Sequence, residues 1–224
     1  MFKLTLLGAA AVAAIALGFG DADATQGTRT FSVTIANVST DDALALPDGS
    51  AIRAPIAPGA YAIISGDDRV IRAGEPVGDT GLEPLSEDGN AEPLIASLKA
   101  TPGVRVAGLF VPGQSFQVEV QPGDRLVFAS MFVQSNDLFY APRSGAVDLF
   151  DGNGMPVSGD LTETVALWDA GTEVNQQPGV GSEQAPRQSG PNTGVDENGV
   201  VRLVADGFTY PEVDQVIRLS IEPQ

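Results

Sequence analysis

The sequence contains no cysteine and no histidine among its 224 residues. The absence of cysteine excludes disulfide bonds, a thiol nucleophile and an iron–sulfur cluster. The absence of histidine excludes an ordinary zinc site, a haem iron bound by histidine and a Ser-His-Asp triad. Any metal must therefore be bound through oxygen, and carboxylates, carbonyls and side-chain amides select hard cations such as Ca²⁺ or Mg²⁺.

Positive charge is also scarce, because 12 lysine and arginine residues stand against 29 aspartate and glutamate residues. The formal net charge is −17 at pH 7. Proteins that bind nucleic acid present a basic surface to the phosphates, whereas a surface this acidic repels a polyanion. We therefore expect no nucleic-acid partner.

Long apolar runs are confined to the N-terminus. Lys3 supplies a positive charge, residues 4–19 are uncharged and mostly apolar, and Ala22 and Ala24 are small residues where a signal peptidase needs them. We interpret residues 1–24 as a signal peptide and residues 25–224 as a single domain without a transmembrane segment. The alternative is a membrane anchor, but this segment is shorter than the ~20 residues that span a bilayer. The mature chain is then secreted, periplasmic or at the cell surface.

Glycine and proline are plentiful, with 26 and 16 residues, and both interrupt helices and favour short strands joined by turns. Alternating apolar side chains indicate half-buried strands, and Phe31, Val33 and Ile35 share one face of the first strand. The strands predicted in this way cover residues 30–36, 115–121, 125–133, 146–150, 164–168, 200–204 and 213–221. The sequence therefore predicts an all-β fold.

Turn residues between these strands predict two hairpins. A Pro-Gly-Asp turn separates strands 115–121 and 125–133, which we expect to pair. A connection rich in Gly, Pro and Asn predicts that strands 146–150 and 164–168 pair in the same way.

One short helix and one long loop complete the predicted domain. Residues 90–99 place Leu94, Ile95 and Leu98 on one apolar stripe of a helix. Residues 175–198 are polar, rich in Pro and Gly and almost free of large apolar side chains, so they contribute little to a core. Because a strand is predicted again after them, we interpret these residues as a loop within one domain.

Three acidic residues are the candidates for chemistry. Glu119 lies in the middle of a predicted strand, whereas Asp137 and Asp169 each follow one. Loops gather at the two ends of a β-sandwich, so carboxylates at successive strand ends converge there and meet the needs of Ca²⁺. Without a cation such a cluster is unfavourable, because like charges raise one another's pKa. The alternative is that these aspartates only cap turns through Asx hydrogen bonds.

Three segments of the chain form a recognisable series. They read Ser-Met-Phe-Val-Gln-Ser-Asn-Asp-Leu-Phe at 130–139, Asp-Leu-Phe-Asp-Gly at 148–152 and Leu-Trp-Asp-Ala-Gly-Thr-Glu at 167–173. In order and spacing, this series resembles the N-terminal domain of the spondin family, the module found in F-spondin and mindin. The opening strand is also similar, and the resemblance covers about residues 29–223.

The resemblance implies an antiparallel, C2-like β-sandwich with one Ca²⁺ bound by carboxylates at one end. Matched motif by motif, the family's ligands fall on Glu119, Asp137 and Asp169, with Glu173 in the place of a further acid. Two departures stand out, since this chain lacks the cysteines of the animal proteins and Leu138 replaces a tryptophan. The partners of the animal proteins therefore do not transfer. We expect the partner to be an extracellular protein, a glycan or a membrane-surface ligand.

These observations favour a secreted, calcium-binding β-sandwich module for adhesion or ligand recognition that is not an enzyme. An exported hydrolase that uses a carboxylate pair on polysaccharide is one alternative, and it predicts a deep cleft with two carboxyl groups ~5–10 Å apart. A purely structural cell-surface component is the other, and it predicts dispersed, solvated acids.

Overall fold

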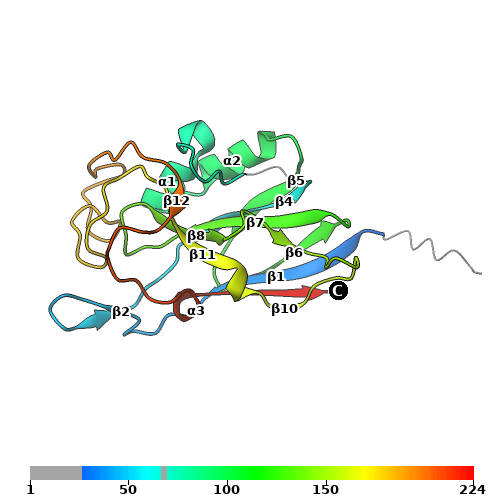
Figure 1. Cartoon of the computed structure of the whole chain (residues 1–224), viewed down its shortest axis with the longest axis horizontal. Helices are drawn as coiled ribbons and strands as arrows, with labels where there is room; N and C mark the ends of the chain where they lie inside the picture. The colour runs from blue at the N-terminus through cyan, green and yellow to red at the C-terminus, as the bar shows by residue number, and fades with distance from the viewer. Residues whose placement is uncertain (1–26, 67–69) are drawn as a thin grey trace, which may run out of the picture.

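Two antiparallel sheets pack face to face within the residues that the computed structural model describes, 27–66 and 70–224 (Figure 1). The smaller sheet has the strand order β10-β13-β1-β6 and is formed by β1 (Arg29–Asn37), β6 (Ser115–Val120), β10 (Gly159–Asp160) and β13 (Ile217–Pro223). The seven-stranded larger sheet has the order β12-β11-β8-β7-β4-β5, and β9 pairs with β7. Its strands are β4 (Gly59–Ser65), β5 (Val104–Phe110), β7 (Asp124–Met131), β8 (Leu138–Pro142), β9 (Val147–Asp148), β11 (Val165–Asp169) and β12 (Arg202–Leu203).

The predicted all-β sandwich is confirmed by this arrangement. The predicted signal peptide, residues 1–24, lies outside the described residues. The remaining elements are a ribbon of β2 (Leu44–Ala45) and β3 (Ala51–Ile52), helices α1 (Leu82–Asp88), α2 (Glu92–Ala100) and α3 (Val213–Val216), and the 3-10 turns η1 (Gly78–Thr80) and η2 (Thr162–Thr164). No helix in residues 27–66 or 70–224 is both long and apolar enough to cross a membrane.

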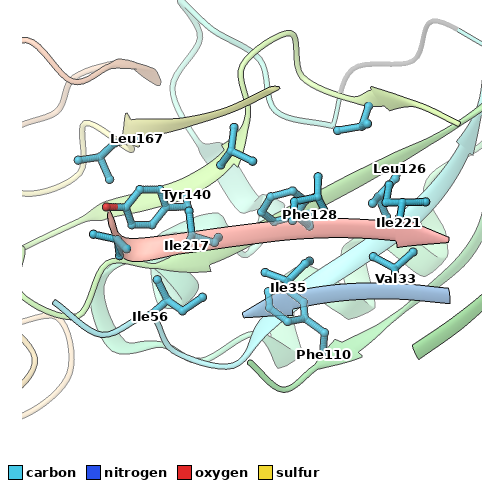
Figure 2. Packing of buried hydrophobic residues seen from close by; sticks show 14 of the residues in the cluster. Val33, Ile35, Ile56, Phe110, Leu126, Phe128, Tyr140, Leu167, Ile217 and Ile221 are labelled. Carbon is cyan, nitrogen blue, oxygen red and sulfur yellow. The ribbon is translucent and has the colours of Figure 1, made fainter. Parts of the chain in front are cut away.

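The main core lies between the two sheets. Alternate side chains of β1, among them Val33 and Ile35, face Leu126 and Phe128 of β7, and all four are almost fully buried (Figure 2). Each such side chain contributes ~1.5–3 kcal/mol by leaving water. The alternation of apolar residues in the sequence of β1 therefore corresponds to a face that is buried in the structure.

The larger sheet is covered on its outer face as well, by α1 and α2 (Figure 1). Leu94, Ile95 and Leu98 are buried on α2, which confirms the predicted helix at residues 90–99. Leu85 of α1 and Trp168 of β11 belong to the same buried cluster. Because both faces of the sheet are covered, its central strands are apolar almost throughout rather than alternating.

The first predicted hairpin is wrong. Strand β6 pairs with β1 in the smaller sheet, whereas β7 pairs with β4 in the larger one. Val118 of β6 and Leu126 of β7 are buried in the same core between the sheets. The turn at 121–123 therefore carries the chain across the core from one sheet to the other instead of folding two strands side by side.

The second predicted hairpin is also wrong. Strand β9 pairs with the first part of β7, and β11 pairs with β8 and β12. The connection between them visits the smaller sheet, where β10 pairs with β13, before it returns to β11. Residues 213–216, predicted as strand, form α3 because Glu212 and Gln215 make a capping box that starts a helical turn.

Candidate metal centre

Strand pairing brings Asp137 and Asp169 together at one end of the larger sheet. Asp137 directly precedes β8, and Asp169 is the last residue of β11. The two strands are antiparallel, with Asp169 opposite Leu138, so the end of one strand meets the beginning of the other. Both aspartates are fully buried.

The long loop adds a third carboxylate, that of Glu197. The Glu197 amide donates to the Thr172 carbonyl oxygen at 2.8 Å, and the Gly199 amide donates to the Gly171 carbonyl oxygen at 2.7 Å. One carboxylate oxygen from each of Asp137, Asp169 and Glu197 lies within 4.8 Å of the others. The returning loop is thus fixed by backbone hydrogen bonds beside the corner that follows β11.

Asp137 is the most unusual member of the group. Its Oδ2 accepts hydrogen bonds from the Thr172 amide at 2.7 Å, the Thr172 hydroxyl at 3.1 Å and the Glu173 amide at 3.1 Å. Its Oδ1 is buried and has no hydrogen-bond partner among the residues that the structure describes. Burial, reinforced by the nearby charge of Asp169, raises the pKa of Asp137 to about 7. An ionised carboxylate in such surroundings is costly unless a cation is close to it.

Asp169 and Glu197 share one positive charge, the guanidinium of Arg202. Arg202 Nη2 lies 2.8 Å from Asp169 Oδ2 and 2.8 Å from both carboxylate oxygens of Glu197. Asp169 Oδ2 also accepts from Asn175 Nδ2 at 2.8 Å. Burial nevertheless raises the pKa of Asp169, an effect that the Arg202 charge opposes. A single arginine therefore only partly offsets three carboxylates.

Asp169 also caps a turn, as the sequence allows. Its Oδ1 accepts a hydrogen bond from the Gly171 amide at 2.7 Å, which is an Asx turn. This bond orients the carboxylate and leaves Oδ2 facing Arg202 and Asn175. Turn capping and cation binding are therefore compatible roles for this residue.

Glu119 lies elsewhere in the molecule. It is exposed on β6 of the smaller sheet, opposite Thr30, and its neighbours Val118 and Val120 point into the core. Alternation along a strand directs its side chain to the outer surface. The structure therefore brings together two of the three predicted ligands and places Glu197, which the sequence did not indicate, beside them.

Glu173 is buried next to the group without being part of it. Its Oε2 accepts from Asn136 Nδ2 at 3.2 Å and its Oε1 accepts from the Gly194 amide at 2.8 Å. Asn136 Oδ1 accepts in turn from the Gln176 amide at 3.0 Å. Burial raises the pKa of Glu173. These contacts attach the first part of the long loop to Asn136 and a later part to Glu173.

Glu87, on α1, is a second buried acid near the centre. Its Oε2 is buried without a hydrogen-bond partner. Burial raises its pKa to about 7, and the charges of Glu173, Glu83 and Asp137 act in the same direction. Because α1 was not predicted, nothing connected this residue with the strand ends before the structure was known.

One sequence feature that was not used points to Glu197, namely its place close before the basic Arg202, where the polar loop leads into a predicted strand. Strand β12 pairs with β11 so that Arg202 lies opposite Asp169, and residues just before β12 must therefore pass the end of β11. The pattern to look for is an acidic and a basic residue close together where a polar loop leads into a strand. The loop itself has no periodicity that indicates where its side chains lie.

An open cavity of about 340 Å³ lies beside the carboxylates. It is lined by Val174, Asn175, Glu197, Arg202, Asp206 and Phe208. Of the three carboxylates, the partly buried one of Glu197 lines this cavity, together with its partner Arg202. Three carboxylates, one of them with an unpartnered buried oxygen, form a donor set suited to a hard divalent cation. Comparison with models of known protein families and with curated protein sequences found no match.

Proposed function

We propose that this chain is an exported, calcium-binding β-sandwich module that recognises a ligand or mediates adhesion and is not an enzyme. The observation that carries the metal site is Asp137, whose Oδ1 is buried without a partner while its carboxylate stands beside those of Asp169 and Glu197. These three residues would hold the ion. Glu119, on the opposite sheet, takes no part in this site.

Calcium is the ion that the site favours. All available donors are oxygen atoms, and Ca²⁺ accepts irregular sets of carboxylates, carbonyls and water, whereas Mg²⁺ demands a near-ideal octahedron. Asp169 and Glu197 already share Arg202, so the largest gain from a bound ion is at Asp137. When bound, the ion would neutralise charge and join the ends of two strands to the long loop.

Export and recognition are supported by the sequence. Residues 1–24 have the charge, apolar segment and small residues of a signal peptide, and Ca²⁺ is abundant outside cells. The resemblance to the spondin N-terminal domain supports a role in adhesion or ligand recognition. The partner proposed is an extracellular protein, a glycan or a membrane surface.

Thermal unfolding of the mature chain in Ca²⁺ and in EGTA tests the metal site. Ca²⁺ at a hundredfold excess over Kd should add ~2.7 kcal/mol to the free energy of unfolding, which corresponds to a rise in Tm of ~5–10 °C. The double variant Asp137→Asn with Asp169→Asn should lose this rise, because it removes two of the three charges that attract the ion.

Glu119→Gln is the matched control and should keep the full rise, since its side chain lies on the far sheet. The metal proposal fails if the wild type shows no rise, or if the double variant shows the same rise as the wild type. Isothermal titration with Mg²⁺ and then Ca²⁺ identifies the preferred ion.

A further inference from the structure

The larger sheet ends in an open edge at β5. Within residues 27–66 and 70–224, β5 pairs with β4 on one side and with no strand on the other. Antiparallel strands pair through backbone amides and carbonyls, so the outer groups of an edge strand form a template for one more strand. The open edge is seven residues long and contains no proline, lysine or acid.

The open edge is also apolar. Two large apolar side chains of β5 are exposed, Val106 at 39% and Leu109 at 50%, and Val111, directly after the strand, is exposed at 38%. The strand itself is firmly held, because Phe110 is buried in the core and the ring of Tyr61 lies over Gly108. Tyr61 is in turn stacked on Phe116 with ring centroids 4.1 Å apart. The exposed side chains therefore sit on an ordered strand.

Charge indicates which partner fits the open edge. The longest stretch of the chain without an acid runs from Pro93 to Val118 and includes all of β5. Arg105 is the one charged residue of β5. Its Nε donates to Asp124 Oδ1 of β7 at 2.7 Å, across β4, so the charge of Asp124 balances that of Arg105. Two copies of a chain with a net charge of −17 repel each other over most surfaces. They approach with the least repulsion where both present a strand without acidic residues.

We propose that β5 is a self-association surface, on which a second copy of this chain adds its own β5 in antiparallel orientation. The larger sheets of the two subunits then form one continuous sheet across a two-fold axis, and each subunit contributes its own β5 to the interface. Pairing removes Val106 and Leu109 from water and satisfies the free backbone groups. This inference does not depend on the metal site.

Sedimentation velocity of the mature chain over a wide concentration range tests the proposal. The wild type should form a dimer whose fraction rises with concentration. The double variant Val106→Glu with Leu109→Glu places two acids on the open edge and should raise the dimer Kd by at least about tenfold. In the dimer, backbone amides of residues 104–110 should also exchange more slowly with solvent than in the monomer.

The matched control is Met155→Glu with Val195→Glu. These side chains are exposed by 62% and 70% on other parts of the surface, so this variant carries the same added charge and should keep the wild-type Kd. Unchanged Tm values show that both variants fold. The proposal is overturned if the wild type is monomeric at every concentration or if the edge variant has an unchanged Kd. It is also overturned if the Kd rises equally in the edge variant and the control.

Discussion

Arg202 pairs with two of the three carboxylates of the candidate site, so the three differ in how far their charge is offset. Its Nη2 contacts Asp169 and Glu197 at 2.8 Å, whereas Asp137 keeps one buried oxygen without a partner. Removing one member of a partly buried ion pair is costly, because the other charge stays without compensation. If the proposed site binds a metal ion, Arg202 should therefore stabilise the chain chiefly in its metal-free form.

Arg202→Gln should lower the stability of the chain in EGTA and increase its response to Ca²⁺. We expect a loss of ~1–3 kcal/mol without metal, because Asp169 and Glu197 lose their shared positive charge. Ca²⁺ replaces that charge, so the rise in Tm on adding Ca²⁺ should exceed that of the wild type. Thermal unfolding with and without EGTA measures both quantities.

Arg218→Gln is the control for this prediction. Arg218 faces Asp160 at 3.4 Å in an exposed pair, and such pairs contribute ~0–1 kcal/mol. Equal Ca²⁺ responses in Arg202→Gln, Arg218→Gln and the wild type would contradict the role given to Arg202.

Among the elements, the corner after β11 sets the position of the site. Gly171 has a φ of +71°, and a Cβ atom there would lie 2.6 Å from the Val200 backbone nitrogen. A left-handed conformation and a close backbone approach both require glycine. The loop can return beside Asp169 only because no side chain separates these two segments.

Gly171→Ala should therefore destabilise the chain more than a glycine substitution usually does. We expect a loss of more than ~2 kcal/mol, since the left-handed backbone alone costs ~1–2 kcal/mol and the clash with Val200 adds to it. Gly49→Ala is the matched comparison, because its φ is +86° and nothing lies within 4 Å of the added Cβ atom. Urea unfolding of the two variants gives the difference, and equal losses would show that the close approach is unimportant.

Local pattern predicted the elements better than it predicted their partners. The alternation of Phe31, Val33 and Ile35 and the stripe on α2 correspond to buried faces in the structure. Both hairpins were wrong because a turn sequence states that the chain reverses, not which sheet the next strand joins. Helix α1 was missed because it is short, with only Leu82 and Leu85 as buried apolar residues.

The candidate site was predicted in part for the same reason. Asp137 directly precedes β8 and Asp169 ends β11, two buried strands that pair, and strand ends are visible in the sequence. Glu197 depends on the path of residues 175–198, which hydrogen bonds such as those of the buried Gln184 fix one by one. Contacts of this kind follow no sequence period and become visible only in three dimensions.

For the molecule as a whole, two buried acids make the free energy of unfolding depend on pH. Asp137 and Glu87 have pKa values of about 7 in the folded chain, above the ordinary carboxyl values. The folded state therefore keeps protons that the unfolded state has released. The stability that these two groups contribute is fully present below about pH 4 and is lost as pH rises to about 7.

The metal-free chain should accordingly have a lower Tm at about pH 8 than at about pH 5.5. A rise in the pKa of Asp137 from 3.8 to about 7 corresponds to at most on the order of 4 kcal/mol. The variant Asp137→Asn with Glu87→Gln should flatten this dependence, because neither side chain then titrates. Thermal unfolding in EGTA across this pH range is the measurement, and an unchanged slope in the variant would contradict the assignment.

The pairing of β1 with β13 joins the two ends of the described chain. Phe31 lies opposite Pro223 and Asn37 opposite Ile217, so the first strand is covered on that side only by the last. Contacts between residues so far apart in sequence close a long loop, which costs conformational entropy and slows folding. The smaller sheet therefore cannot close until synthesis has reached β13, so a chain that is still being made leaves the β13 side of β1 unpaired.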